Sequence, residues 1–190
     1  SAASDVYKRQ TTNGTLIDKR WDELAASGVD SLSFSIDGLE ATHDRLRGQK
    51  GAWRRTWAAI ERVRQAGITA SVYSVATNEN VGQLVAIYER ARSLGCGFDF
   101  WPVNDAPDLY ITSEADRKTW MDAVNHIAAA EPAVAGRRAF YTEGLDYHAG
   151  ALPAGAVRCL GLVDQYGVTF EGDLLPCCAV SYTHLRAHET

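Results

Sequence analysis

Polar side chains that could bind a charged ligand follow directly after a strand-like stretch at residues 31–36. In that stretch apolar residues alternate with serines, and Asp37-Gly38 then ends it with residues typical of a turn. An ionisable imidazole and a cation follow at His43 and Arg47. Because ligands bind at the carboxyl ends of strands in α/β sheets and barrels, this is the expected active-site edge.

Hydrolase chemistry is not favoured for these residues. His43 and Asp44 are adjacent on an expected loop, where neighbours rarely face each other, and no serine or cysteine nucleophile is placed to use them. The sequence also lacks a glycine-rich phosphate loop of either common spacing. Two simpler interpretations stay open: Asp37-Gly38 as only a turn, and Arg47 as one half of a loop salt bridge.

Cysteines are the second group of residues that could do chemistry. The chain has four, at Cys96, Cys159, Cys177 and Cys178, so three of them fall in its last quarter. At 190 residues with 46% hydrophobic content the chain can bury a core without disulfides. In a reducing compartment such a cluster is more often metal-binding or catalytic, although three reduced thiols without a metal are the alternative.

Strands and helices are expected to alternate along most of the chain. After a strand end at Asn13, strands are predicted at 31–36, 68–77 and 96–103, and helices at 16–27, 52–66, 81–94 and 113–131. Asn80 is expected to cap the third helix and Ser113 the fourth. The alternation implies right-handed parallel crossovers, so the fold class is α/β, a partial (βα) TIM-like barrel of about four parallel βα units.

Two stretches interrupt this pattern. The segment between Asp37 and Gly51 is expected to be a long loop, because no helical periodicity resumes before Gly51. Residues 132–158 are rich in glycine and predict a linker, with a domain boundary near 150–158. A β-hairpin is predicted over residues 166–177.

The strand ends resemble those of radical S-adenosylmethionine (AdoMet) enzymes. Ser35-Ile36-Asp37-Gly38, then His43-Asp44 and Arg47-Gly48, is similar to the fourth strand and loop of that family. Thr12-Asn13-Gly14 is similar to its third-strand end. The resemblance implies that Ser35 and Asp37 contact the ribose or the carboxylate of AdoMet, with Asn13 nearby, and that Arg47 pairs with the carboxylate.

The cysteine-rich end resembles the C-terminal SPASM or twitch domain of the same family. Cys159, Gly172 and Cys177 have the spacing that opens the SPASM pattern. The resemblance implies that Cys159 and Cys177 are ligands of an auxiliary iron–sulfur cluster of the 4Fe-4S type, because cluster irons need soft, anionic donors. Altogether the resemblance covers about residues 11–180.

For the parent protein the resemblance implies an enzyme with two cofactors, AdoMet and a 4Fe-4S cluster. It would cleave AdoMet reductively to a 5′-deoxyadenosyl radical, which removes hydrogen from a substrate such as a peptide, a protein or a cofactor precursor. No catalytic residue is assigned. The family's Cys-x3-Cys-x2-Cys loop does not occur in the sequence, and further SPASM cysteines would lie beyond residue 180. The chain is therefore expected to be a fragment that is inactive alone.

The two ends resemble translated sequencing adaptors and are expected to be non-native. The expected organisation is a tail at 1–10, a partial radical SAM barrel at 11–150, the start of a SPASM or twitch domain at 151–180 and a tail at 181–190. A small-molecule cofactor is the expected partner. Neither nucleic acid nor membrane is indicated, because the net charge is −5 and no apolar run could span a bilayer. The cytoplasm is the expected compartment.

Two other classes of protein remain as alternatives. One is a different (βα) barrel enzyme, such as a metal-dependent sugar isomerase, which needs carboxylate and histidine ligands at several strand ends. Only Asp37 and Asp105 are so placed. The other is a non-catalytic binding domain.

Overall fold

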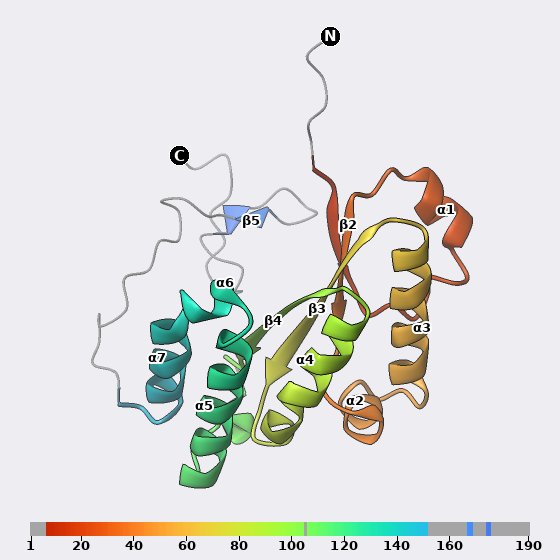
Figure 1. Ribbon diagram of the computed structural model, residues 1–190. Coiled ribbons are helices and arrows are strands. Elements are labelled where there is room, and N and C mark those ends of the chain that lie inside the picture. Colours follow the sequence, from red (N-terminus) through yellow and green to blue (C-terminus); the bar gives the residue numbers. More distant parts are fainter. Residues whose placement is uncertain (1–6, 105, 152–166, 169–173, 176–190) are drawn as a thin grey trace. The chain divides into compact units, whose positions relative to one another are not determined.

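The chain divides into two compact units, Ser1–Gly150 and Ala151–Thr190. The computed structural model describes the following residues of these units (Figure 1): 7–104, 106–151, 167–168 and 174–175. Cys159, Cys177 and Cys178 lie outside the described residues, as do Asp105, Gly172 and most of both expected tails. The assignment of the units to a partial radical SAM barrel and a SPASM domain stays a prediction.

Four parallel strands form the sheet of the first unit, in the order β1-β2-β3-β4. The strands are β1 (Arg9–Thr12), β2 (Ser31–Ser35), β3 (Thr69–Ala76) and β4 (Gly97–Pro102). Because this order follows the sequence, each connection leads from one strand to its next parallel neighbour. The sheet confirms the predicted α/β fold class and the four parallel strands of a partial (βα) barrel.

Helices fill the connections and follow the last strand. The α-helices are α1 (Trp21–Ala26), α2 (Glu40–Leu46), α3 (Ala52–Gln65), α4 (Leu84–Ser93), α5 (Glu114–Ala128), α6 (Pro132–Ala135) and α7 (Arg138–His148). Short 3-10 helices precede α4 and α5, namely η1 (Val81–Gln83) and η2 (Pro107–Leu109). Figure 1 shows α3, α4 and α5 along one side of the sheet.

The pairing register separates an apolar face of the sheet from a polar one. Phe34 and Val72 are neighbours on adjacent strands, and so are Ser35 and Tyr73 on the opposite face. The apolar residues of β2 and β3 pack with those of α3 and α4 in one buried cluster. The side chain of Ser35 therefore belongs to the face that these helices do not cover.

The core consists of two clusters of buried side chains, and Phe98 packs against both of them. The first is built around Phe34 and Trp57, where β2 meets α3. In the second, the ring of Phe100 on β4 packs on that of Trp120 on α5, with ring centroids 5.3 Å apart. Burial of these rings is the main favourable term that holds the helices on the sheet.

Two stretches of the first half differ from the prediction. The expected loop between Asp37 and Gly51 contains α2, whose one buried residue is His43. A helix of seven residues that buries so little shows no apolar periodicity in the sequence. The predicted helix at 16–27 is shorter than expected, because turns occupy residues 15–20 before α1.

The predicted linker at 132–158 is wrong in its first part, which forms α6 and α7. Gly144 suggests a helix break in the sequence, yet it lies inside α7. A Cβ atom at Gly144 would lie 2.8 Å from Cγ of Pro102, so glycine is needed there for the close approach of α7 to β4.

Two further expectations concern the ends of the chain. Arg9 and Gln10, which the resemblance to an adaptor assigns to a tail, lie in β1 and pair with Ser31 and Leu32. In the second unit β5 (Gly167–Val168) pairs antiparallel with β6 (Leu174–Leu175), as the predicted hairpin requires. In the part of the chain that the structure describes, no helix is long and apolar enough to cross a membrane.

Replacing Phe100 with alanine tests the second core cluster. Phe100 is fully buried, so Phe100→Ala is expected to lower the free energy of unfolding by about 3–5 kcal/mol, through lost burial and the cavity left behind. Phe140→Ala is the matched control: this ring is 39% exposed, and the loss is expected to stay below about 1 kcal/mol. Urea denaturation measures both, and equal losses would contradict the assignment of Phe100 to the core.

Candidate cofactor site at the carboxyl edge of the sheet

Asp37 is the best-anchored residue at the carboxyl edge of the sheet. Its main-chain N–H donates to Nδ1 of His43 at 3.1 Å, and its main-chain oxygen accepts from Nδ2 of Asn80 at 2.9 Å. One carboxylate oxygen, Oδ1, accepts from the N–H of Val75 at 3.0 Å, and the other forms an ion pair with Arg47. The residue is 8% exposed.

The turn after β2 explains why His43 and Arg47 can reach Asp37. A Cβ atom at Gly38 would lie 2.8 Å from Cβ of Thr42, so only glycine lets α2 begin this close to the strand. One helical turn separates His43 from Arg47, which places both on the same side of α2. The chain thus bends at Gly38, directly after Asp37, and this bend also assembles the site.

His43 and Asp44 bond to different partners and not to each other, as expected for adjacent residues. Asp44 accepts from the N–H groups of Gly51 and Trp53 at the start of α3. These bonds, chiefly that from Trp53, lower the pKa of the Asp44 carboxyl. His43 is 1% exposed, and burial lowers the pKa of its imidazole, against a smaller opposing influence of the Asp37 charge. The imidazole is therefore a neutral acceptor.

The prediction that Asn80 caps a helix is wrong. No side-chain hydrogen bond caps η1, and the Asn80 amide is instead buried between the ends of β2 and β3. It donates to the main-chain oxygens of Asp37 and Val75 and accepts from the N–H of Thr77. The Asp37 contact joins residues 43 positions apart in the sequence, which no local pattern could reveal.

Asn13 and Ser35 lie at the same level of the edge, because both directly follow the pair Thr12–Phe34 in the parallel register. Asn13 is exposed, and its Oδ1 accepts from N–H and Oγ1 of Thr15 in a local turn. Ser35 is half-buried, and its hydroxyl makes no hydrogen bond to any of the described residues. The structure thus brings Asp37 and Arg47 into contact, with Ser35 two residues before Asp37, whereas the Asn13 side chain bonds within its own loop.

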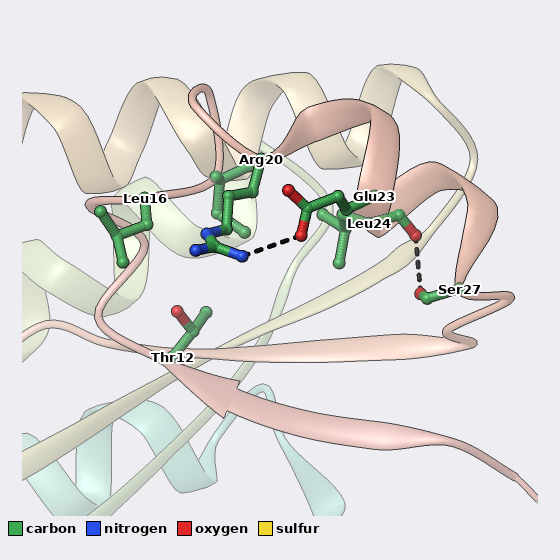
Figure 2. Close-up of a pocket in the computed structure, with 7 residues that line it drawn as sticks. Thr12, Leu16, Arg20, Glu23, Leu24 and Ser27 are labelled. Atoms are coloured by element: carbon green, nitrogen blue, oxygen red, sulfur yellow. Dashed lines mark hydrogen bonds and ion pairs between the residues drawn. The ribbon is translucent and has the colours of Figure 1, made fainter.

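A hollow of about 270 Å³ lies elsewhere, beside β1 and α1 (Figure 2). Its lining is mostly apolar, and two of the lining residues, Arg20 and Glu23, form an ion pair with an N–O distance of 2.9 Å. None of the predicted site residues lines it. Since the polar groups that could fix a ligand are at the ends of β2 and β3, the candidate site is there and not in this hollow.

The described residues of the first unit do not support cysteine or metal chemistry. Among the residues that the structure describes, no three histidine, cysteine or acidic side chains gather where they could hold a metal ion. Cys96 is buried just before β4 starts, at the opposite end from the candidate site, and burial raises the pKa of its thiol. This environment disfavours the thiolate form of Cys96.

The fold and the site together define a class: a partial (βα) barrel with a polar, preformed group at the carboxyl edge of its strands. Comparison with known proteins finds a family model that matches part of the chain. Residues 2–91 match the model of the Radical SAM superfamily, a stretch that includes Asn13, Ser35, Asp37 and Arg47. The match also begins within the segment that resembles an adaptor.

Individual relatives agree with this match. The chain is 41% identical over 86 residues to an AdoMet-dependent heme synthase of Methanosarcina barkeri, an alignment that covers 44% of the chain and 25% of the relative. It is 28% identical over 187 residues to a PqqA peptide cyclase of Gluconobacter oxydans, with coverages of 92% and 49%. The crystal structure of SuiB from Streptococcus suis has the same fold, with a TM-score of 0.64 at 16% identity over 97% of this chain and 47% of that one. The chain spans about half the length, or less, of these proteins.

The neutral state of His43 predicts how stability depends on pH. Because the pKa of His43 is lowered in the folded chain, the unfolded chain takes up a proton first as the pH falls below 6.5, the ordinary value for imidazole. The stabilisation is therefore present above that pH and is lost on acidification. His148 is buried with a lowered pKa as well and contributes in the same direction.

Urea denaturation at a series of pH values between neutral and mildly acidic measures this effect. We expect the wild-type free energy of unfolding to fall on acidification, and His43→Gln to remove part of that fall. His126→Gln is the control, since His126 is half exposed and pairs with Glu89 on the surface. A His43→Gln protein with the same pH dependence as the wild type would contradict a buried neutral imidazole.

Proposed function

We propose that this chain is a segment of a radical AdoMet enzyme and that the carboxyl edge of β2 binds AdoMet. The observation that carries the proposal is the Asp37–Arg47 ion pair, together with a Ser35 hydroxyl, two residues before Asp37, that makes no hydrogen bond to the described residues. AdoMet bears a carboxylate, an ammonium group and ribose hydroxyls. A guanidinium, a carboxylate and a hydroxyl are complementary to these groups.

We assign different roles to these residues. The Arg47 side chain is 34% exposed and that of Asp37 only 12%, so the guanidinium is the more accessible half of the pair. Arg47 therefore receives the AdoMet carboxylate, and Asp37 holds the guanidinium in place. The Ser35 hydroxyl takes a ribose hydroxyl or the carboxylate. Asn13 is a weaker candidate, because its side-chain oxygen is used by Thr15.

When bound together with a reducing iron–sulfur cluster, AdoMet supplies a carbon-centred radical that removes hydrogen from a substrate. The residues of this chain bind and orient the cofactor. In the parent protein Cys159 and Cys177 would hold an auxiliary cluster of a SPASM or twitch domain, and the chain alone would not cleave AdoMet.

A peptide is the substrate class that we favour. The similarity to the PqqA peptide cyclase extends over 92% of the chain, whereas that to the AdoMet-dependent heme synthase is confined to 44%. A cofactor precursor is the second candidate, since several other relatives are heme synthases. A metal-dependent isomerase is disfavoured, because Asp37 is occupied by Arg47 and the described part of the chain offers no three-ligand group.

Substitution of Arg47 tests the cofactor site. Isothermal titration of AdoMet into the chain should show an affinity that falls by about tenfold or more in Arg47→Gln, because a charge-assisted pair with the carboxylate is lost. Arg45→Gln is the matched control on the same helix. Arg45 pairs with Glu79 away from Asp37, so its loss should change the affinity less than about twofold. Equal affinities in the two variants, or no AdoMet binding by the wild type, would contradict the proposal for this chain.

Anaerobic iron–sulfur reconstitution tests the cysteine proposal. We expect bound iron and sulfide, with charge-transfer absorbance in the visible, that are lost in a Cys159→Ala/Cys177→Ala variant. Cys96→Ala is the control, because this thiol is buried in the first unit and should not contribute. Iron content that is the same in all three proteins would contradict a cluster held by Cys159 and Cys177 in this chain.

A further inference from the structure

The connection between β3 and α4 reaches across to the turn that follows β2. Asn80 donates from Nδ2 to the main-chain oxygens of Asp37, at 2.9 Å, and Val75, at 2.8 Å. Its Oδ1 accepts from the N–H of Thr77 at 2.7 Å. The residue is 1% exposed, so these bonds form away from water, where an unmade one is costly.

A second carboxamide from the same connection holds the next part of the turn. Gln83 accepts at Oε1 from the N–H of Leu39 at 2.7 Å and donates from Nε2 to Oγ1 of Thr42 at 2.9 Å. Gly38 lies close to the Gln83 side chain, since a Cβ atom at Gly38 would be 3.0 Å from Oε1 of Gln83. The residues on both sides of Gly38, Asp37 and Leu39, are therefore each bound by one amide side chain.

We propose that Asn80 and Gln83 are positioning residues of the cofactor site. They fix the main chain of the turn, which fixes the Asp37 carboxylate and, through the ion pair, the Arg47 guanidinium. The inference rests on the proposed function of that site. Its physical reason is preorganisation: a guanidinium already held in place loses less freedom when it binds a carboxylate.

The hydrogen bonds distinguish this role from a simple helix cap. A cap residue needs only an acceptor, so aspartate serves there as well as asparagine. Asn80 uses both acceptor and donor, because two main-chain oxygens face its Nδ2 atom. In Asn80→Asp the acceptor for Thr77 is kept, but a carboxylate without a donor opposes the oxygens of Asp37 and Val75. This substitution keeps the size of the side chain and reverses its interaction with the turn.

The test compares Asn80→Asp with Asn78→Asp in the full 190-residue chain. Asn78 undergoes the same chemical change two residues earlier, where it is exposed and donates to the main-chain oxygen of Asp108. Two quantities are measured: the affinity for AdoMet by calorimetry, and the hydrogen exchange of the Asp37 amide by nuclear magnetic resonance.

We expect Asn80→Asp to weaken AdoMet binding by about tenfold or more and to speed exchange of the Asp37 amide by a similar factor, relative to amides of the core strands. Asn78→Asp should leave both within about twofold. Normalising exchange to core amides separates loosening of the turn from a general loss of stability, which would speed all amides alike.

Unchanged Asp37 exchange in Asn80→Asp, or equal changes in both variants, would overturn the positioning role. A wild-type chain that does not bind AdoMet would count against the proposed function alone, because amide exchange still reports on the turn. If Asn80→Asp does not fold, Gln83→Leu replaces it, with exchange read at Leu39 and Asp37. This variant should speed exchange at both positions, and no change at either would overturn the proposal.

Discussion

The site depends on the complete hydrogen bonding of Asp37. Its N–H, its main-chain oxygen and both carboxylate oxygens each have a partner, and the partners come from α2, from β3 and from the connection to α4. A buried polar group that lacks a partner is costly, so each of these contacts constrains the others. The ends of β2 and β3 are consequently tied together at one point, and the turn after β2 has little freedom to move.

Two buried histidines extend this constraint along the edge of the sheet. Nδ1 of His43 accepts from the N–H of Asp37, and Nδ1 of His148 accepts from that of Ile111 at 3.1 Å. Nε2 of His148 lies 2.6 Å from the main-chain oxygen of Val103, just after β4. Both imidazoles must stay neutral to accept these bonds, and burial lowers the pKa of each accordingly. The carboxyl edge is thus held by groups that protonation would disrupt.

The sequence predicts the sheet and the helices of the core, because alternation and helical periodicity are local signals of burial. The serines and apolar residues of β2 alternate in the sequence just as the two faces of the strand do in the structure. Local signals fail for α2, which buries only His43, and for α7, where Gly144 has a packing role that depends on Pro102. A helix can therefore be predicted from its periodicity only when it packs apolar side chains against the core.

The candidate site shows the same limit. Ser35, Asp37 and Arg47 are proposed from their place at or after the end of a strand and from the resemblance to a family motif, whereas the contacts of His43 and Asn80 could not be predicted in this way. Asn80 donates to the main-chain oxygens of Asp37 and Val75. Asp37 is distant from Asn80 in the sequence, and only folding brings the two together. In the sequence, an asparagine after a strand has the pattern of a helix cap. What distinguishes Asn80 from a cap is the use of its side-chain N–H groups as donors, and a sequence pattern does not specify their partners.

The proposed AdoMet site gives the Asp37–Arg47 pair a role that stability alone does not provide. An ion pair taken from water gives back little net free energy, because desolvation offsets the attraction between the charges. The pair is also asymmetric, since the Asp37 side is more deeply buried than the Arg47 side. The main-chain N–H of Val75, in β3, donates to the Asp37 carboxylate, and the side chain of Asn80, just before η1, donates to the Asp37 main-chain oxygen. Asp37 therefore does not need Arg47 to stay in place. The pair holds a partly exposed guanidinium at the edge of the sheet, and under the proposed function this is the group that the AdoMet carboxylate meets.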